Sequence, residues 1–177
     1  MRLPLLLLVP VAGLCAGLSA ADAGSPSLPA ASAAVDSAIA RPDLDAYRGW
    51  LKYLRLLAEE TTARHGADSA EARAAIVRLD DWTRRITADP GLLGKLRGVQ
   101  EWAYESPVDG TGQPFKIVIP TDYDPARPAP VSVYMHGYTG DHLNHSAGFH
   151  DHDGFFDVAV LGRARGGWYV GLSQADV

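Results

Sequence analysis

The residues with the clearest chemical meaning lie where a short apolar segment ends in His136-Gly137. The segment, residues 131–135, is rich in β-branched and aromatic side chains and predicts a strand buried on both faces of a sheet. Open α/β sheets place their active sites at the C-terminal ends of such strands. We expect Gly137 to adopt a conformation that a Cβ would disfavour, with backbone N–H groups near it holding an oxyanion. Gly137 and Tyr138 are therefore the oxyanion-hole candidates, and His136 supports their turn.

A histidine-rich segment follows and supplies a second group of candidates. Five of the six histidines lie between residues 136 and 152, and Asp141, Asp151 and Asp153 add carboxylates. Imidazole and carboxylate groups are zinc ligands, so one interpretation is a metal site. The other, which we favour, is a polar, solvent-facing loop beside an active site, because no His-Glu-x-x-His pattern supports the metal. The metal candidates are His142, His145, His150 and His152.

The sequence contains no Gly-x-Ser-x-Gly nucleophile motif, and its nearest approach surrounds Ser173. Ser173 follows the strand-like residues 168–170, and only residues 163–167 separate these from Gly162 at the end of the preceding run. A crossover between parallel strands needs about a dozen residues or more, so this spacing cannot place Ser173 after the next parallel strand. We therefore assign no catalytic nucleophile, acid or base within this chain. Arg163 and Arg165 are interpreted either as a clamp for an anionic substrate or, as we favour, as partners of acidic residues on a later helix that this sequence does not contain.

The chain's periodicity predicts helices first and strands afterwards. Apolar residues at helical spacing indicate amphipathic helices over residues 44–58 and 70–86, joined as a helical hairpin. Four strands are expected in the second half, the first two joined as a β-hairpin by the turn-rich residues 107–112. The predicted strands are residues 99–105, 115–119, 131–135 and 157–161.

The ends of the sequence predict export. A basic Arg2, an apolar stretch and small residues near Ala21 indicate a cleaved signal peptide over residues 1–21, shorter than the ~20 apolar residues of a membrane span. Residues 22–41 are expected to be a flexible leader. Ser173 and Asp176 are spaced like a helix start, so we interpret the chain as the front part of a longer protein. A secreted or periplasmic location follows.

Composition narrows the classes of partner. The formal net charge of −5 argues against nucleic acid, whose phosphates favour basic surfaces. One cysteine among 177 residues excludes a disulfide framework and a cysteine-based zinc site. No cofactor is implied, and no membrane partner is expected after the signal is removed.

The order of these features resembles a known family. Pro114-Phe115-Lys116-Ile117-Val118-Ile119-Pro120, a proline-rich crossing, Val133-Tyr134-Met135-His136-Gly137 and the glycine-rich residues 162–171 are similar to the opening of secreted α/β-hydrolases. The closest groups are prolyl oligopeptidase-like enzymes and polyhydroxybutyrate-depolymerase-like esterases. The resemblance covers about residues 99–177. It implies serine attack on an ester or peptide substrate, with the Tyr138 N–H as one oxyanion donor.

These patterns predict an α/β fold: an incomplete α/β-hydrolase-type sheet preceded by a helical hairpin. Residues 42–98 would be a helical appendage, and residues 99–177 the truncated N-terminal part of the hydrolase domain, lacking its nucleophile. The last strand, near residues 157–161, would then present an unpaired edge. Two alternatives remain at this stage: a non-catalytic exported binding module, and a metal-dependent protein that uses the His/Asp loop 142–153.

Overall fold

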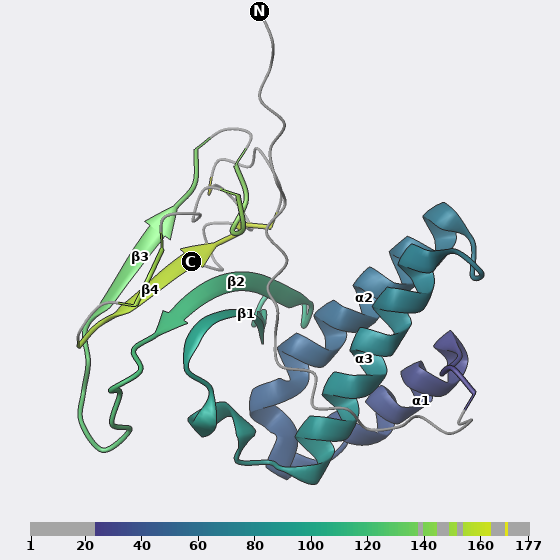
Figure 1. Ribbon diagram of the computed structural model, residues 1–177, viewed down its shortest axis with the longest axis horizontal. Coiled ribbons are helices and arrows are strands. Elements are labelled where there is room, and N and C mark those ends of the chain that lie inside the picture. Colours follow the sequence, from purple (N-terminus) through teal and green to yellow (C-terminus); the bar gives the residue numbers. More distant parts are fainter. Residues whose placement is uncertain (1–23, 138–139, 145–148, 152–153, 164–168, 170–177) are drawn as a thin grey trace, which may run out of the picture.

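The computed structural model describes residues 24–137, 140–144, 149–151, 154–163 and 169. In this part of the chain three α-helices precede a four-stranded sheet, which confirms the mixed α/β class (Figure 1). The helices are α1 (Leu28–Ile39), α2 (Arg48–His65) and α3 (Ala70–Ala88). Short 3₁₀ helices, η1 (Pro42–Tyr47) and η2 (Leu92–Lys95), lie before α2 and after α3.

Helix α1 corrects the prediction of a flexible leader over residues 22–41. Its N-terminus is capped by the Ser27 side chain, which accepts the Ala30 N–H, and a proline stands in its first turn. Ala31, Val35 and Ala38 are buried against the other helices. The alanine content that suggested a leader is also what gives this segment high helix propensity. The N-terminal part is therefore a unit of three helices and not a hairpin of two.

Four strands form one sheet in the order β1-β2-β4-β3. Strands β1 (Gly98–Glu105) and β2 (Gly112–Ile119) pair antiparallel, as the turn-rich connection predicted. Strand β4 (Phe156–Val160) pairs antiparallel with β2 and parallel with β3 (Val131–Met135). Because β4 lies between two neighbours, the expected unpaired edge on the last strand is wrong. Within the described residues, that edge belongs to β3.

The helices and the β1–β2 hairpin share one hydrophobic core. Trp50 of α2 stacks on Trp102 of β1 with ring centroids 5.0 Å apart, and Trp82 of α3 packs edge-on against both rings at 5.5 Å. Leu51, Leu54 and Leu79 are buried in the same cluster. The predicted boundary between residues 98 and 99 therefore does not divide two separate cores, because this cluster contains side chains from both sides of it.

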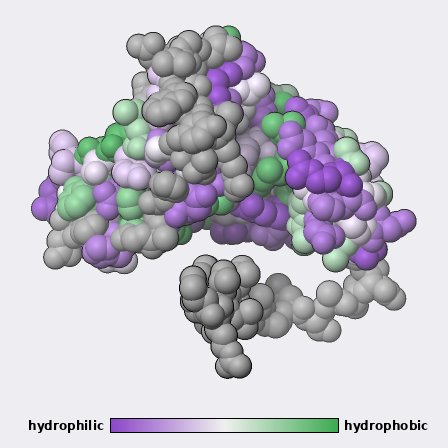
Figure 2. Space-filling model, turned by 90° about the horizontal axis from the view of Figure 1, so that it is seen from above, coloured by the Kyte–Doolittle hydropathy of each residue, from purple (hydrophilic) through white to green (hydrophobic). Residues whose placement is uncertain are grey.

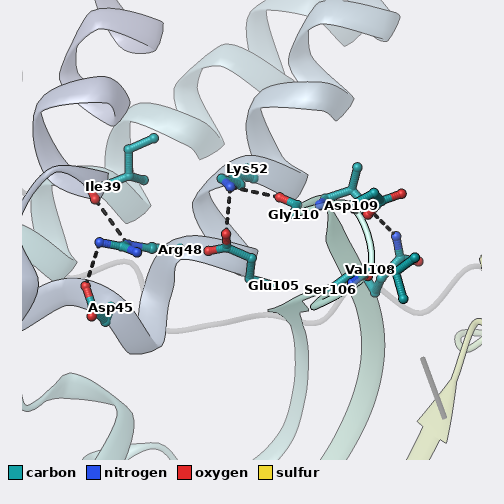
Figure 3. Close-up of polar contacts among 11 residues, drawn as sticks. Ile39, Asp45, Arg48, Lys52, Glu105, Ser106, Val108, Asp109 and Gly110 are labelled. Atoms are coloured by element: carbon teal, nitrogen blue, oxygen red, sulfur yellow. Dashed lines mark hydrogen bonds and ion pairs between the residues drawn. The ribbon is translucent and has the colours of Figure 1, made fainter. Parts of the chain in front are cut away.

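Polar contacts also join α2 to the hairpin, at the turn between its strands (Figure 3). The Lys52 ammonium donates to the Glu105 carboxylate at 2.9 Å and to the Gly110 carbonyl at 2.8 Å. Arg48 donates to the Ile39 carbonyl and pairs with Asp45, which ties the start of α2 to the preceding helices. The first two strands are thus fixed to the helical unit by apolar and polar contacts together.

Strand β3 differs most from its sequence expectation. All five of its residues are exposed, whereas the apolar run predicted burial on both faces. Val131, Val133 and Met135 stand on one face, opposite Phe156, Val158 and Val160 of β4 in the parallel register. Hydrophobic residues reach the surface on this side of the molecule (Figure 2). Strand β3 is apolar, as the sequence shows, but none of the described elements covers this face of it.

An exposed apolar sheet face of this kind should bind hydrophobic dyes and promote self-association. We expect Val133→Lys to lower the fluorescence of bound anilinonaphthalene sulfonate and to shift the chain toward the monomer in sedimentation velocity. Val77→Lys, a change of another exposed valine, on α3, is the matched control and should alter neither measurement. Equal dye binding by the parent chain and Val133→Lys would contradict the exposure of this face.

Candidate functional site

His136-Gly137 lies where two parallel strands end together. Met135 at the end of β3 is paired with Val160 at the end of β4, and His136 and Leu161 follow them directly. Backbone groups beyond the C-terminal ends of parallel strands are not used by the strand ladder, and they are therefore free to bind a ligand. The structure thus places His136 and Gly137 at the end of the sheet that the sequence predicted.

The His136 ring is buried and faces backbone carbonyl oxygens. Its Nε2 lies 2.7 Å from the Leu161 carbonyl oxygen, and its Nδ1 lies 2.9 Å from that of Gly137. A neutral imidazole carries one N–H and donates to only one of these oxygens. The His136 backbone N–H donates to the Tyr169 hydroxyl at 3.0 Å, and this hydroxyl donates to the Val160 carbonyl. These contacts fasten the turn to the end of β4 and suit a supporting role for His136.

Gly137 does not have the conformation that was expected of it. Its φ lies outside the left-handed region, and a Cβ at this position would have no atom of the described residues within 4 Å beyond its chain neighbours. The turn is closed by the Gly140 N–H, which donates to the Gly137 carbonyl at 3.0 Å, and this geometry does not require glycine. The expectation of a backbone that a Cβ would disfavour is therefore wrong. Tyr138, the second oxyanion candidate, lies outside the described residues.

The segment after this turn, residues 140–144, is held by its own side chains. One oxygen of the buried Asp141 carboxylate accepts the Leu143 N–H at 2.9 Å and the Asn144 N–H at 2.7 Å. The Asp141 N–H in turn donates to the Asn144 side-chain oxygen at 3.0 Å. Reciprocal bonds between a side chain and nearby backbone of this kind stabilise a compact turn. We call residues 140–144 the Asp141 turn.

The Asp141 turn reaches the helical unit through His142. The His142 side chain is 6% exposed, and its Nε2 lies 3.2 Å from a carboxylate oxygen of Glu101 on β1. Glu101 also accepts the Tyr53 hydroxyl of α2 at 2.9 Å and the Arg78 guanidinium of α3 at 2.7 Å. Four separate elements therefore meet at one carboxylate, which we call the Glu101 junction.

Electrostatics favour an ionised carboxylate at this junction. Burial alone would raise the pKa of Glu101, but hydrogen bonds from His142, Arg78 and Tyr53 outweigh it and lower the pKa to about 2. Burial, followed by the Glu101 charge, raises the pKa of the Tyr53 hydroxyl, which therefore stays protonated and donates. A junction of this composition keeps one negative charge opposite one guanidinium at ordinary pH. No motif or spacing in the sequence points to Glu101, Tyr53 or Arg78.

The described histidines do not assemble a metal centre. Among residues 24–137, 140–144, 149–151, 154–163 and 169, no group of three or more His, Cys, Asp or Glu side chains is placed to hold a metal ion. His142 is buried and directed at Glu101, whereas His150 is exposed. His145 and His152 lie outside the described residues. Of the histidines that the structure describes here, His142 is a buried contact of Glu101, so the expectation of a wholly solvent-facing loop is wrong for this residue.

Arg163 is already engaged by the β1–β2 turn. Its guanidinium donates to Asp109 at 2.6 Å and to the Ser106 hydroxyl at 2.8 Å, and its side chain is 15% exposed. The hydrogen bond from Arg163 is the main cause that holds the pKa of Asp109 well below its usual range. Arg163 therefore does pair with an acidic residue, but that residue belongs to the β1–β2 turn and not to a later helix, as was expected. Arg165 and Ser173 lie outside the described residues.

Comparisons with protein-family models, with curated proteins and with solved structures found no match. In the described part of the chain, no helix combines the length and the apolar character that crossing a membrane requires.

Proposed function

We propose that this chain is the N-terminal portion of an exported serine hydrolase that acts on ester or peptide bonds. The observation that carries the proposal is the position of His136-Gly137, directly after β3 and beside the end of its parallel neighbour β4. The antiparallel β1–β2 hairpin precedes them, so His136-Gly137 follows the third strand, which is the strand after which α/β-hydrolases have their oxyanion turn. Local sequence and strand order therefore support the same proposal.

In the proposed mechanism the chain contributes electrostatic stabilisation. The Tyr138 N–H, together with the amide that follows the nucleophilic serine, holds the oxyanion of the tetrahedral intermediate. His136 fixes the turn through the Leu161 carbonyl and Tyr169, and does not act as the general base, because its ring faces backbone carbonyls. The serine, its base and its acid lie in the part of the protein that follows residue 177. No cofactor takes part.

The test is made on the protein as its host produces it. A fluorophosphonate probe, which reacts with activated serines, is added to the secreted fraction, and labelled proteins are captured with an antibody raised against α2 and α3. We expect a labelled protein larger than 18.9 kDa, with a Gly-x-Ser-x-Gly motif in the reading frame after residue 177. An antibody-reactive protein that never labels would refute the hydrolase and favour a non-catalytic exported module.

Gly137→Ala separates folding from turnover in this proposal. Because a Cβ there has no atom of the described residues within 4 Å beyond its chain neighbours, the free energy of unfolding should change by less than about 0.5 kcal/mol. Turnover of an ester substrate by the host-made enzyme should fall at least about tenfold, because the added methyl group intrudes beside the developing oxyanion. His150→Ala, at an exposed position, is the control and should retain full turnover. Unchanged turnover in Gly137→Ala would remove this turn from the oxyanion hole.

A further inference from the structure

At the Glu101 junction the helical unit meets the segment that follows His136-Gly137 through a partly buried carboxylate. Glu101 lies on β1, its side chain is 18% exposed, and its partners come from α2, α3 and the Asp141 turn. The carboxylate therefore links elements that are up to about ninety residues apart in the chain, counting from Tyr53 to His142.

We propose that Glu101 is a positioning residue: through His142 it anchors the Asp141 turn, and with it the His136-Gly137 turn, to helices α2 and α3. The effect of this role on catalysis rests on the proposed function. The anchoring itself is a property of the described residues and is tested separately.

The segment from His136 to the Asp141 turn is held at both of its ends. At the sheet end, the His136 ring faces the Leu161 carbonyl, and its N–H donates to Tyr169. At the helix end, the buried His142 ring meets Glu101. The Gly140 N–H donates to Gly137 between these two points. Oxyanion donors must be held to within about 0.5 Å of their productive place, so a second point of attachment has a direct consequence for turnover.

The helical side of the anchor is rigid enough to serve this purpose. Arg78 lies 5.2 Å from the centroid of the Trp50 ring while it donates to Glu101, so the guanidinium is fixed by the aromatic core and by the carboxylate together. Tyr53 packs beside Trp50, with ring centroids 5.8 Å apart, and donates to the other oxygen of the same carboxylate. The helices therefore orient the carboxylate that receives His142.

The experiment compares Glu101→Gln with Glu105→Gln by hydrogen exchange of the purified chain. Both glutamates lie on β1, but Glu105 pairs with Lys52 at the β1–β2 turn, whereas Glu101 receives His142 of the Asp141 turn. Glu101→Gln should accelerate exchange of amides 140–144 by at least about tenfold, because it removes a charge-assisted hydrogen bond. In this variant the protection of amides 140–144 should fall below that of α2 and α3, because the helices lose protection only through the general loss of stability. Glu105→Gln should leave amides 140–144 as they are.

His142→Gln provides the second variant. It should accelerate exchange of the same amides, and the double variant with Glu101→Gln should exchange no faster than the faster single variant, because both changes break one contact. Unchanged exchange at 140–144 in Glu101→Gln would overturn the anchor. Equal protection of amides 140–144 and of α2 and α3 in Glu101→Gln would also overturn it, since it would show that the turn opens only when the whole chain unfolds.

The effect of the Glu101 anchor on catalysis is tested in the protein that the host produces. Glu101→Gln should slow fluorophosphonate labelling at least about fivefold, and Glu105→Gln should not. Normal labelling in Glu101→Gln, despite faster exchange at 140–144, would show an anchor without a positioning role. If the unaltered protein does not label, the proposed function fails, whereas the exchange experiment still decides on the anchor.

Discussion

Replacing Gly49 with alanine is expected to lower the free energy of unfolding by about 3 kcal/mol or more, or to prevent folding. Gly49 lies in the first turn of α2, where its backbone packs directly on the β1–β2 hairpin. A Cβ at this position would stand well inside van der Waals contact of the Tyr104 carbonyl carbon and the Glu105 nitrogen. These are backbone atoms, so they cannot rotate away, and helix and hairpin would have to separate.

The destabilisation expected for Gly49→Ala is opposite in sign to the effect that helix propensity alone predicts. Alanine is favoured over glycine in helices by about 1 kcal/mol, so propensity alone predicts stabilisation. Gly94→Ala in η2 is the control, because a Cβ there meets open space, and its unfolding free energy should change by less than about 0.5 kcal/mol. Urea titrations followed by tryptophan fluorescence measure both variants. Gly49→Ala at least as stable as the parent chain would show that α2 does not lie against Tyr104.

The helices and strands could be predicted because their signals are local. Amphipathic spacing places α2 and α3, and turn chemistry between two apolar runs places the β1–β2 hairpin, which the antiparallel register confirms. Helix α1 was missed because its alanines suit both a leader and a helix, and only burial of Val35 distinguishes the two. The prediction that β3 is buried was wrong, because an apolar run indicates that a strand can be buried but does not show which element would cover it.

Only the part of the candidate site that is contiguous in the sequence could be predicted. A strand that ends in His-Gly is visible in the sequence, and the structure places it beside the end of β4. The Glu101 junction was not predictable, because its members come from four elements and no spacing rule connects them. From the sequence alone, Glu101 would be expected to be exposed to solvent, and only the structure shows that Arg78 and His142 face it. Long-range polar contacts of this kind require the packed structure.

Glu101 also gives the fold a specific sensitivity to acid. Its pKa is lowered from 4.5 to about 2 in the folded chain, so the unfolded chain binds the proton more readily. The unfolding free energy must therefore rise with pH where the unfolded carboxylate is protonated and the folded one is not. This contribution is fully present above about pH 4.5 and is lost as the pH falls toward 2. A shift of this size corresponds to about 3 kcal/mol.

We therefore expect Glu101→Gln to flatten the stability profile between pH 5 and pH 2. The parent chain should lose about 3 kcal/mol more than the variant over this interval, measured by urea unfolding at a series of pH values. Glu105→Gln is the matched control, because its pair with Lys52 is partly exposed and such pairs contribute at most about 1 kcal/mol. Parallel profiles for the parent chain and Glu101→Gln would mean that the carboxylate is not bound by Arg78, Tyr53 and His142 in solution. The Asp141 turn would then have no charged anchor on the helices.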